Sequence, residues 1–391
     1  TIAPNPLSKC LDFWGTVQGG SAGAAGTVGN MTVDQLMRQM RAGWNLGNTF
    51  DAADATTYET NWGAPATTQA MIDALKVKGF NLIRLPLSLH NAMNAGTLTI
   101  DPGLLQRYRE VVDYCINNDM FVIVNSHHDN DHSNPPAFYD MGTAFRAETA
   151  AFLTAVWTQL GEEFQSYDDH VIFEGMNEPR AELGEVSGGQ MANPYWYDPN
   201  NAACLNTIEN LNDANQIFVD AVRATGGNNA QRFLMVPSIS ANSMYALAPE
   251  FRIPLDSGPG VNRILVSVHS YTPNWMSLEG TNPNFDPNGQ EGEWIQDMMS
   301  ALRARFVDHG TGVIIGEWGT SNLNNTNERI EHAKFYVTAA ATNGIVCTWW
   351  DNGGRNVGGE NFELFRRAEL TWPYPGLAEA IVGSANIAEL P

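Results

Sequence analysis

Two glutamates stand at the ends of apolar segments, where an unpaired buried charge would cost several kcal/mol. Glu178 follows the apolar segment 171–176 and is held extended by Pro179, and Glu317 lies near the end of the apolar segment 313–318. Two carboxyl groups that face each other, one protonated and one ionised, can protonate a leaving oxygen and attack the carbon it leaves. The pair therefore indicates acid/base and nucleophilic catalysis rather than two surface glutamates.

A third charge, Arg84, lies inside the apolar segment 82–86. A buried guanidinium needs a carboxylate partner, so we expect Arg84 to pair with Glu317 and to keep that carboxylate ionised. A structural salt bridge at the end of a sheet is the alternative interpretation of the same arginine.

Two adjacent histidines, His127 and His128, raise the question of a metal site. Adjacent residues of an extended segment face opposite ways, and no third ligand stands at a convincing spacing. We therefore expect neither a metal nor any other cofactor.

The elements that must position these residues follow a regular rhythm of short apolar segments and amphipathic stripes. Pro102 follows the N-cap candidate Asp101, and one apolar face then runs through 104–116, which predicts a helix. Similar helical stripes occupy 145–164, 208–222 and 294–306. The eight predicted strands are 42–46, 81–87, 121–125, 171–176, 232–236, 263–269, 313–318 and 345–350.

Apolar segments without alternation indicate strands covered on both faces, and eight strand–helix units favour closure into a TIM (β/α)8 barrel. A doubly wound open sheet is the competing fold, but the first strand lacks the glycine spacing of a phosphate-binding turn. In a barrel, the loops after the strands carry the chemistry. The two longest connections, about 180–206 and 272–290, are therefore expected to form the walls of a cleft.

A geometric estimate tests whether Glu178 and Glu317, on the fourth and seventh strands, can act together. Eight strands about 4.8 Å apart and tilted by about 36° give a barrel roughly 15 Å across. Two inward side chains then leave roughly 6 Å between the carboxyl groups. That spacing is nearer the roughly 5 to 5.5 Å of a retaining glycosidase than most of the range for inverting enzymes.

The chain resembles glycoside hydrolase family 5, the cellulase family of clan A, and most closely its subfamily 4 endoglucanases. The motifs that carry the resemblance appear in order from Trp44 to Trp350. Each is weak alone, and the set is specific. The matching segments are 44–51, 83–86, 125–129, 173–179, 269–271 and 316–319.

The resemblance implies a retaining endo-β-1,4-glucanase with Glu178 as acid/base and Glu317 as nucleophile. Asn177 would bind the sugar 2-hydroxyl, and His269 and Tyr271 would support the two glutamates. His127 would lie in the substrate cleft as a hydrogen-bonding residue, and His128 would have a structural or secondary role. Trp350 is the platform for a sugar ring that the family match favours, whereas Trp349 is expected in the core. The full supporting or substrate-binding set is Asn45, Arg84, His127, His128, Asn177, His269, Tyr271 and Trp350, with Trp62, Trp196 and Trp275 as loop candidates.

Composition excludes several classes of partner. The 391 residues carry 21 Lys and Arg against 43 Asp and Glu, a net charge of −22. Such an acidic chain disfavours nucleic acid and anionic membranes, while a neutral β-glucan polysaccharide is compatible with it. No stretch reaches the roughly 20 apolar residues of a membrane span. We expect a secreted monomer that acts without a cofactor.

We expect residues 1–30 to form a loosely ordered lead-in and residues 31–391 to form a single barrel domain with long loops. Cys115 lies on an apolar helical stripe and Cys347 inside an apolar strand, and both are expected in the core. Cys10 and Cys204 remain as a possible surface bridge.

Two other classes of function stay open at this level. The chain is compatible with a polysaccharide-binding barrel that has lost catalysis, although both glutamates are present. A metal-dependent hydrolase that uses the histidines is the other class. Within the family, xyloglucanase, lichenase, xylanase and mannanase specificities also remain, because loops rather than strand ends select the polysaccharide.

Overall fold

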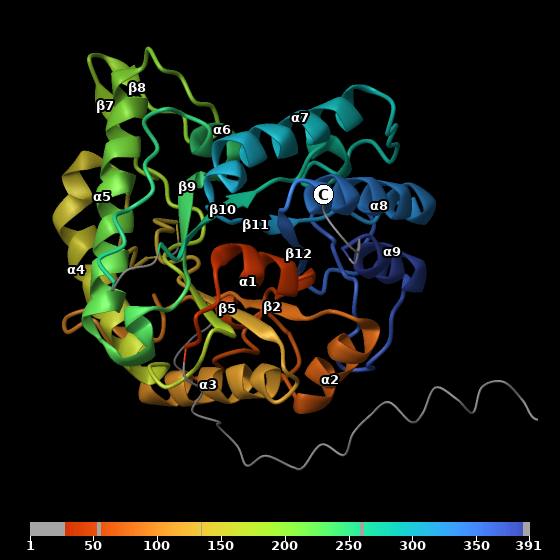
Figure 1. Cartoon of the computed structure of the whole chain (residues 1–391), viewed down its shortest axis with the longest axis horizontal. Coiled ribbons are helices and arrows are strands. Elements are labelled where there is room, and N and C mark those ends of the chain that lie inside the picture. Colours follow the sequence, from red (N-terminus) through yellow and green to blue (C-terminus); the bar gives the residue numbers. More distant parts are fainter. Residues whose placement is uncertain (1–27, 53–55, 134, 259–261, 386–391) are drawn as a thin grey trace, which may run out of the picture.

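The computed structural model describes residues 28–52, 56–133, 135–258 and 262–385. Its centre is a closed barrel of eight parallel strands in the order β1-β12-β11-β10-β9-β6-β5-β2. In Figure 1, helices surround these strands. The predicted TIM (β/α)8 barrel is therefore confirmed, and the open doubly wound sheet is excluded because the first and last strands pair.

Each of the eight predicted strands coincides with a barrel strand, and three have the predicted bounds. The largest difference is in β9, which runs six residues past its predicted end. The barrel strands are β1 Ala42–Leu46, β2 Leu82–Leu85, β5 Phe121–Asn125, β6 Val171–Glu174, β9 Leu234–Asn242, β10 Ile264–His269, β11 Val313–Trp318 and β12 Val346–Asp351.

The helices follow the predicted stripes. α3 begins after Asp101, whose carboxylate accepts hydrogen bonds from the backbone amides of Gly103 and Leu104. The helices are α1 Val33–Gln39, α2 Gln69–Lys78, α3 Pro102–Ile116, α4 Arg146–Glu163, α5 Ala202–Ala224, α6 Ser243–Ala246, α7 Gln290–Arg305, α8 Thr326–Thr342 and α9 Pro375–Ala385. Two hairpins, β3 Met93–Asn94 with β4 Thr99–Ile100 and β7 Val186–Ser187 with β8 Gln190–Met191, decorate the loops.

One end of the barrel is closed by α1. Val33, Leu36 and Met40 pack against buried side chains of the strands, among them Leu265 and Ile314. A capping box between Thr32 and Gln35 starts this helix. In Figure 1, α1 lies across the ends of the strands near the centre of the view. The opposite end of the barrel, where the strands finish, is therefore the one left for chemistry.

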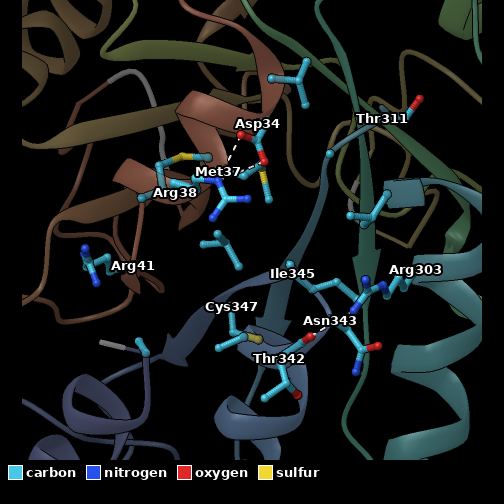
Figure 2. A pocket seen from close by; sticks show the side chains of 18 of the residues that line it. Asp34, Met37, Arg38, Arg41, Arg303, Thr311, Thr342, Asn343, Ile345 and Cys347 are labelled. Atoms are coloured by element: carbon cyan, nitrogen blue, oxygen red, sulfur yellow. Dashed lines mark hydrogen bonds and ion pairs between the residues drawn. The ribbon is translucent and has the colours of Figure 1, made fainter. Parts of the chain in front are cut away.

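A cavity of about 450 Å³ lies at the end closed by α1. Met37 and Arg41 line it from α1 and the start of β1, and Thr311, Ile345 and Cys347 line it from the starts of β11 and β12 (Figure 2). These residues precede or begin their strands, so the cavity lies away from the two glutamates.

The predicted lead-in falls mostly outside the described residues, which begin at Val28. Gly29 is already bound to the barrel, because its amide donates to Asp169 and its carbonyl accepts from Arg263. Cys10, one half of the possible bridge, also lies outside the described residues. Cys204 is buried in α5 with its Sγ 3.2 Å from the hydroxyl of Tyr245.

Two further expectations concern buried and membrane-spanning segments. Cys115 and Cys347 are buried, as predicted. Among the described residues, no helix combines the length and apolar character that a membrane crossing requires.

Candidate active site

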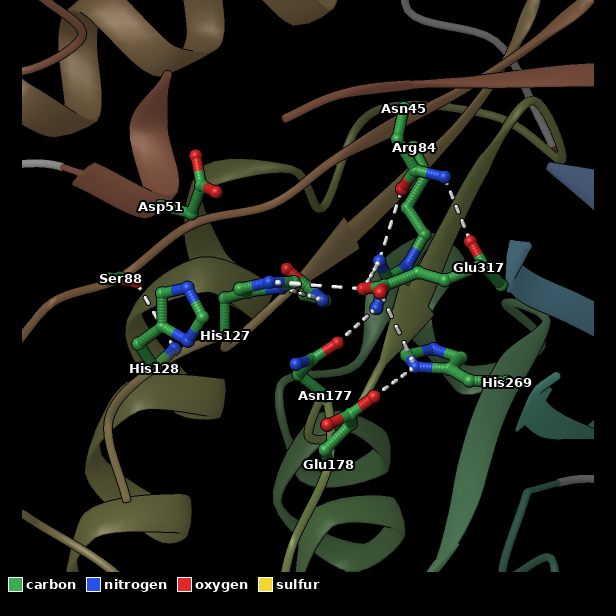
Figure 3. Close-up of polar contacts among 12 residues, drawn as sticks. Asn45, Asp51, Arg84, Ser88, His127, His128, Asn177, Glu178, His269 and Glu317 are labelled. Atoms are coloured by element: carbon green, nitrogen blue, oxygen red, sulfur yellow. Dashed lines mark hydrogen bonds and ion pairs between the residues drawn. The ribbon is translucent and has the colours of Figure 1, made fainter. Parts of the chain in front are cut away.

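The two glutamates meet at the carboxyl end of the barrel. Glu317 is part of β11, and Glu178 follows the end of β6 by four residues. One side-chain oxygen of each, together with a ring nitrogen of His269, lies within 4.8 Å of the others. Figure 3 shows both carboxylates directed toward His269. The structure therefore brings the predicted pair together at the short spacing that the strand geometry suggests.

Glu317 is held through both of its oxygens. Nη1 of Arg84 donates to Oε1 over 2.8 Å, and the hydroxyl of Tyr271 donates to Oε2 over 2.9 Å. Its side chain is 7% exposed. Burial, followed by the charge of Glu317, raises the pKa of Tyr271 well above its usual range, so the hydroxyl remains a donor. The predicted pairing of Arg84 with Glu317 is thus present, and both oxygens of Glu317 are held in place.

Arg84 is fully buried and has a second carboxylate partner that the sequence analysis missed. Its Nε donates to Oε2 of Glu174 over 2.6 Å, and its Nη2 donates to Oδ1 of Asn177 over 2.7 Å. Burial alone would lower the pKa of Arg84, but Glu174 and Glu317 outweigh it and raise that pKa. The guanidinium is therefore a charged bridge between the end of β6 and Glu317.

Asn45 completes the surroundings of Arg84. Its Oδ1 accepts from Nη1 of Arg84 over 3.1 Å, and its Nδ2 donates to the carbonyls of Gly316, Thr348 and Trp349. Both ends of the amide are used and the residue is fully buried. Asn45 therefore holds Arg84 in position, and neither polar atom of its side chain is left to bind a sugar.

Glu178 has a different environment from Glu317. Its side chain is 29% exposed, its Oε1 lies 2.8 Å from Nδ1 of His269, and its Oε2 accepts from Arg180 over 3.3 Å. Burial raises the pKa of Glu178, but the hydrogen bond with His269 and the charge of Arg180 outweigh it, so that pKa is lowered overall. Glu178 is therefore the more accessible of the two carboxyl groups, and its pKa is lowered by His269 and Arg180.

A bulge places His269 between the two glutamates. The pairing of β10 with β11 shifts register after Val268, which sets His269 opposite Glu317. Gly316 makes room for the ring, because a Cβ at that position would lie 2.9 Å from Nε2 of His269. The ring can therefore turn Nδ1 toward Glu178 at 2.8 Å while staying 3.7 Å from Oε2 of Glu317.

His127 faces Glu317 from the other side. Oδ1 of Asn125 accepts from the amide of Leu87, so Nδ2 of Asn125 is the atom that donates to Nδ1 of His127. This assigns the ring proton to Nε2, which lies 3.9 Å from Oε1 of Glu317. Burial and the neighbouring His128 hold the pKa of His127 well below its usual range. His127 is therefore a neutral donor beside the nucleophile candidate.

The expectation that His127 and His128 face opposite ways is wrong. β5 ends at Asn125, so the pair lies in a loop, and the two rings are 4.4 Å apart. Together with Asp51, which the sequence analysis did not single out, they form a cluster whose ligand atoms lie within 4.8 Å of one another. However, His127 already uses the lone pair of Nδ1, and its Nε2 carries the proton, so this donor set does not suit a metal.

The predicted tryptophans occupy different positions. Trp350 is stacked on His127 with ring centroids 5.6 Å apart, whereas Trp349 is buried in the core, as expected. Trp62 is 53% exposed and lies 6.0 Å from the ring of His128. These contacts connect Trp350 and Trp62 with the histidines of the site.

The other two tryptophans, Trp196 and Trp275, make contacts with other loops and helices. Trp196 is 63% exposed, and its carbonyl accepts from Tyr245 beyond the end of β9. Trp275 packs against Trp294 of α7, and its ring nitrogen is buried. Among the described contacts of Glu178 and Glu317, none is made with Trp196 or Trp275.

The sequence that forms this site matches a known protein family. Residues 47–356 match the model of the family described as cellulase, glycosyl hydrolase family 5. The matched region contains Glu178, Glu317 and Arg84. The chain belongs to glycosyl hydrolase family 5. The resemblance inferred from the motifs is therefore confirmed.

Individual relatives of this family 5 hydrolase support the same assignment. It is 36% identical over 385 residues to Endoglucanase B of Clostridium cellulovorans, covering 96% of this chain and 81% of that protein. A family 5 lichenase from Caldicellulosiruptor sp. F32, solved with cellotetraose, is 40% identical with a TM-score of 0.84, covering 92% of this chain and 97% of the lichenase. A GH5-4 broad specificity endoglucanase from Clostridium acetobutylicum is 36% identical with a TM-score of 0.79, covering 90% and 100%.

Proposed function

We propose that this family 5 hydrolase cleaves internal β-1,4-glucosidic bonds of cellulose or a related β-glucan by double displacement. The observation that carries the proposal is the carboxylate pair within 4.8 Å, Glu317 buried against Arg84 and Glu178 partly exposed beside His269. Two carboxyl groups this close leave no room for the water that an inverting mechanism needs between one of them and the sugar.

In the first step, an oxygen of Glu317 attacks the anomeric carbon and forms a covalent glycosyl ester. The bond to the leaving oxygen breaks, and Glu178 gives its proton to that oxygen. In the second step, Glu178 takes a proton from water, the water oxygen attacks the anomeric carbon, and Glu317 is released as a carboxylate. Asn177, whose Nδ2 is not used by Arg84, is the candidate for the sugar 2-hydroxyl.

The charges around Glu178 predict the pH dependence of the first step. The first step needs Glu178 in its protonated form. Because His269 and Arg180 lower the pKa of Glu178, it loses that proton at a lower pH than an isolated glutamate does. We therefore expect kcat/KM to decline on the alkaline side from a lower pH than an unperturbed glutamate would give.

The polymer itself is neutral, which suits a chain of net charge −22. Trp350, stacked on His127, offers an apolar edge for a sugar ring near Glu317, and exposed Trp62 offers a second surface beyond His128. We propose that Trp350 and Trp62 bind consecutive glucose units. Since the substrate is an insoluble or very large polymer, we also propose that the enzyme acts outside the cell.

A second candidate substrate is mixed-linkage β-glucan, which the 40% identity to a lichenase favours. A hydrolysis panel of barley β-glucan, carboxymethylcellulose, xyloglucan, xylan and mannan distinguishes the candidates. For an endo-acting glucanase, the viscosity of carboxymethylcellulose should fall well before reducing ends accumulate. Activity on xylan or mannan alone would overturn the proposed substrate, and Glu317→Ala is the matched inactive control.

A further inference from the structure

Glu174 is a fully buried carboxylate of β6 that touches none of the reacting groups assigned above. Oε2 accepts from Nε of Arg84 over 2.6 Å, and Oε1 accepts from the hydroxyl of Ser267 on β10 over 2.6 Å. Both side chains of the Arg84–Glu174 pair are 0% exposed. The carboxylate is therefore fixed at both oxygens and has no access to substrate.

The charge on this network changes during the proposed reaction. In the free enzyme, Arg84 balances two carboxylates, Glu174 and Glu317. When Glu317 becomes a glycosyl ester, it loses its negative charge, and Glu174 is then the one carboxylate in contact with Arg84 among the described residues. Without Glu174, the intermediate would contain a buried guanidinium with neutral neighbours only, which is a costly arrangement.

We propose that Glu174 is a positioning residue that keeps Arg84 charge-balanced in the covalent intermediate. This inference rests on the proposed double displacement. It predicts that Glu174 lowers the barrier to forming the ester, because ester formation is the step that removes the other negative charge. Hydrolysis of the ester restores that charge, so the second step does not need Glu174 to the same degree.

The geometry supports a positioning role in the free enzyme as well. Nη2 of Arg84 donates to Asn177, which precedes Glu178 on the segment that continues β6 beyond Glu174. One guanidinium thus connects Glu174 and Asn177 to Glu317. Fixing Nε with Glu174 sets the plane of that guanidinium, and the plane sets where Nη1 and Nη2 point.

The test uses Glu174→Gln and a cellobioside with an excellent leaving group, 2,4-dinitrophenyl β-cellobioside. With this substrate, ester formation is fast in the wild-type enzyme, so a burst of dinitrophenolate should precede the steady state. In Glu174→Gln, we expect kcat/KM to fall about 100-fold and the burst to disappear, because ester formation becomes limiting. A variant that keeps both the burst and the wild-type kcat/KM would overturn the inference.

A milder variant covers the case in which Glu174→Gln does not fold. Ser267→Ala removes the hydrogen bond to Oε1 of Glu174 and keeps the charge, so we expect kcat/KM to fall several-fold with the burst retained. Unchanged kinetics in Ser267→Ala, together with an unfolded Glu174→Gln, would reduce Glu174 to a structural residue and contradict the proposal.

A control at the other end of the barrel separates stability from kinetics. Asp169 pairs with the buried Arg263 over 2.9 Å, away from the glutamates. Asp169→Asn should lower the melting temperature and leave the burst and kcat/KM unchanged. If Asp169→Asn abolished the burst as Glu174→Gln does, the effect would be one of general stability and the inference would fail.

The wild-type enzyme also distinguishes failure of this inference from failure of the proposed function. A 2-deoxy-2-fluoro cellobiosyl inactivator should leave a covalent adduct on Glu317, detected by mass spectrometry of peptides. Absence of any adduct would overturn double displacement itself. An adduct and a burst in the wild type, with identical behaviour in Glu174→Gln, would overturn only the role of Glu174.

Discussion

Arg84 and Arg232 are both fully buried in the barrel, at opposite ends of it. Arg84 lies where the strands finish and contacts two carboxylates, those of Glu174 and Glu317. Arg232 precedes β9 and donates to neutral oxygens only: Oδ1 of Asn229 and the carbonyls of Phe164, Tyr167, Asp168 and Val171. Burial lowers the pKa of Arg232, whereas the carboxylates raise that of Arg84.

The difference separates a guanidinium that serves chemistry from one that serves the fold. Carbonyl oxygens cannot change charge, so Arg232 ties the ends of α4, β6 and β9 together in every state of the enzyme. A carboxylate can be esterified or protonated, so the partners of Arg84 change during turnover. Substitutions at the two ends should therefore separate activity from stability.

The largest expected effect is the loss of turnover in Glu317→Ala. Without a nucleophile, kcat should fall by at least about 10⁴-fold while the melting temperature stays near that of the wild type. Steady-state assays with an aryl cellobioside and thermal unfolding measure the two quantities. Azide should restore part of the activity and yield an α-glycosyl azide, and ordinary activity in the variant would remove the nucleophile assignment.

At the other end, Arg232→Met should affect stability and leave the chemistry unchanged. The substitution strands several buried acceptors, so the free energy of unfolding should fall by about 3–5 kcal/mol. Urea denaturation measures the change, and the exposed Arg38→Met variant should leave the midpoint unaltered. A lowered kcat in the folded Arg232→Met protein would break the separation between the two ends.

Tyr271→Phe sharpens the comparison within the catalytic end. The variant loses the hydroxyl that donates to Oε2 of Glu317, so kcat should fall about 10- to 100-fold with KM almost unchanged. Tyr167→Phe is the matched control, because its hydroxyl also donates to a carboxylate, that of Asp113 on α3, and Tyr167 precedes β6 at the other end of the barrel. Equal kinetic losses in both variants would show that the hydroxyl of Tyr271 has no special role.

The smallest expected effect is a displacement of the pH profile in Arg180→Gln. Arg180 lowers the pKa of Glu178, so its removal raises that pKa and keeps Glu178 protonated to a higher pH. The alkaline limb of kcat/KM should move to higher pH. The shift should be only a few tenths of a pH unit, because the side chains of Arg180 and Glu178 are both partly exposed. A movement to lower pH would contradict the assignment of Glu178 as the acid. Arg252→Gln, which removes an exposed ion pair with Glu209 of α5, should leave the profile unchanged.

Much of the catalytic end was predictable because its charges interrupt apolar strands. The strand positions and the pairing of Arg84 with Glu317 follow from that pattern alone. Glu174 carries the same signal, since it interrupts the apolar segment 171–176 just as Arg84 interrupts 82–86. Matching each buried positive charge to every buried negative one would have found it.

The remaining errors concern loops, where sequence periodicity carries no information. Strand alternation predicts opposite faces for His127 and His128, but the strand ends at Asn125 and the loop brings the two rings together. Trp275 also lies in a loop, and its packing against Trp294 of α7 could not be read from the local sequence. Contacts of this kind depend on tertiary packing rather than on local pattern.

The stereochemistry of the first product tests the central claim most directly. A cello-oligosaccharide hydrolysed in an NMR tube reveals the anomer at the new reducing end before mutarotation mixes the two forms. Double displacement through Glu317 and Glu178 predicts that the β-anomer proton signal grows first. If the α-anomer appeared first, a water molecule would have attacked directly, and the covalent role assigned to Glu317 would be contradicted.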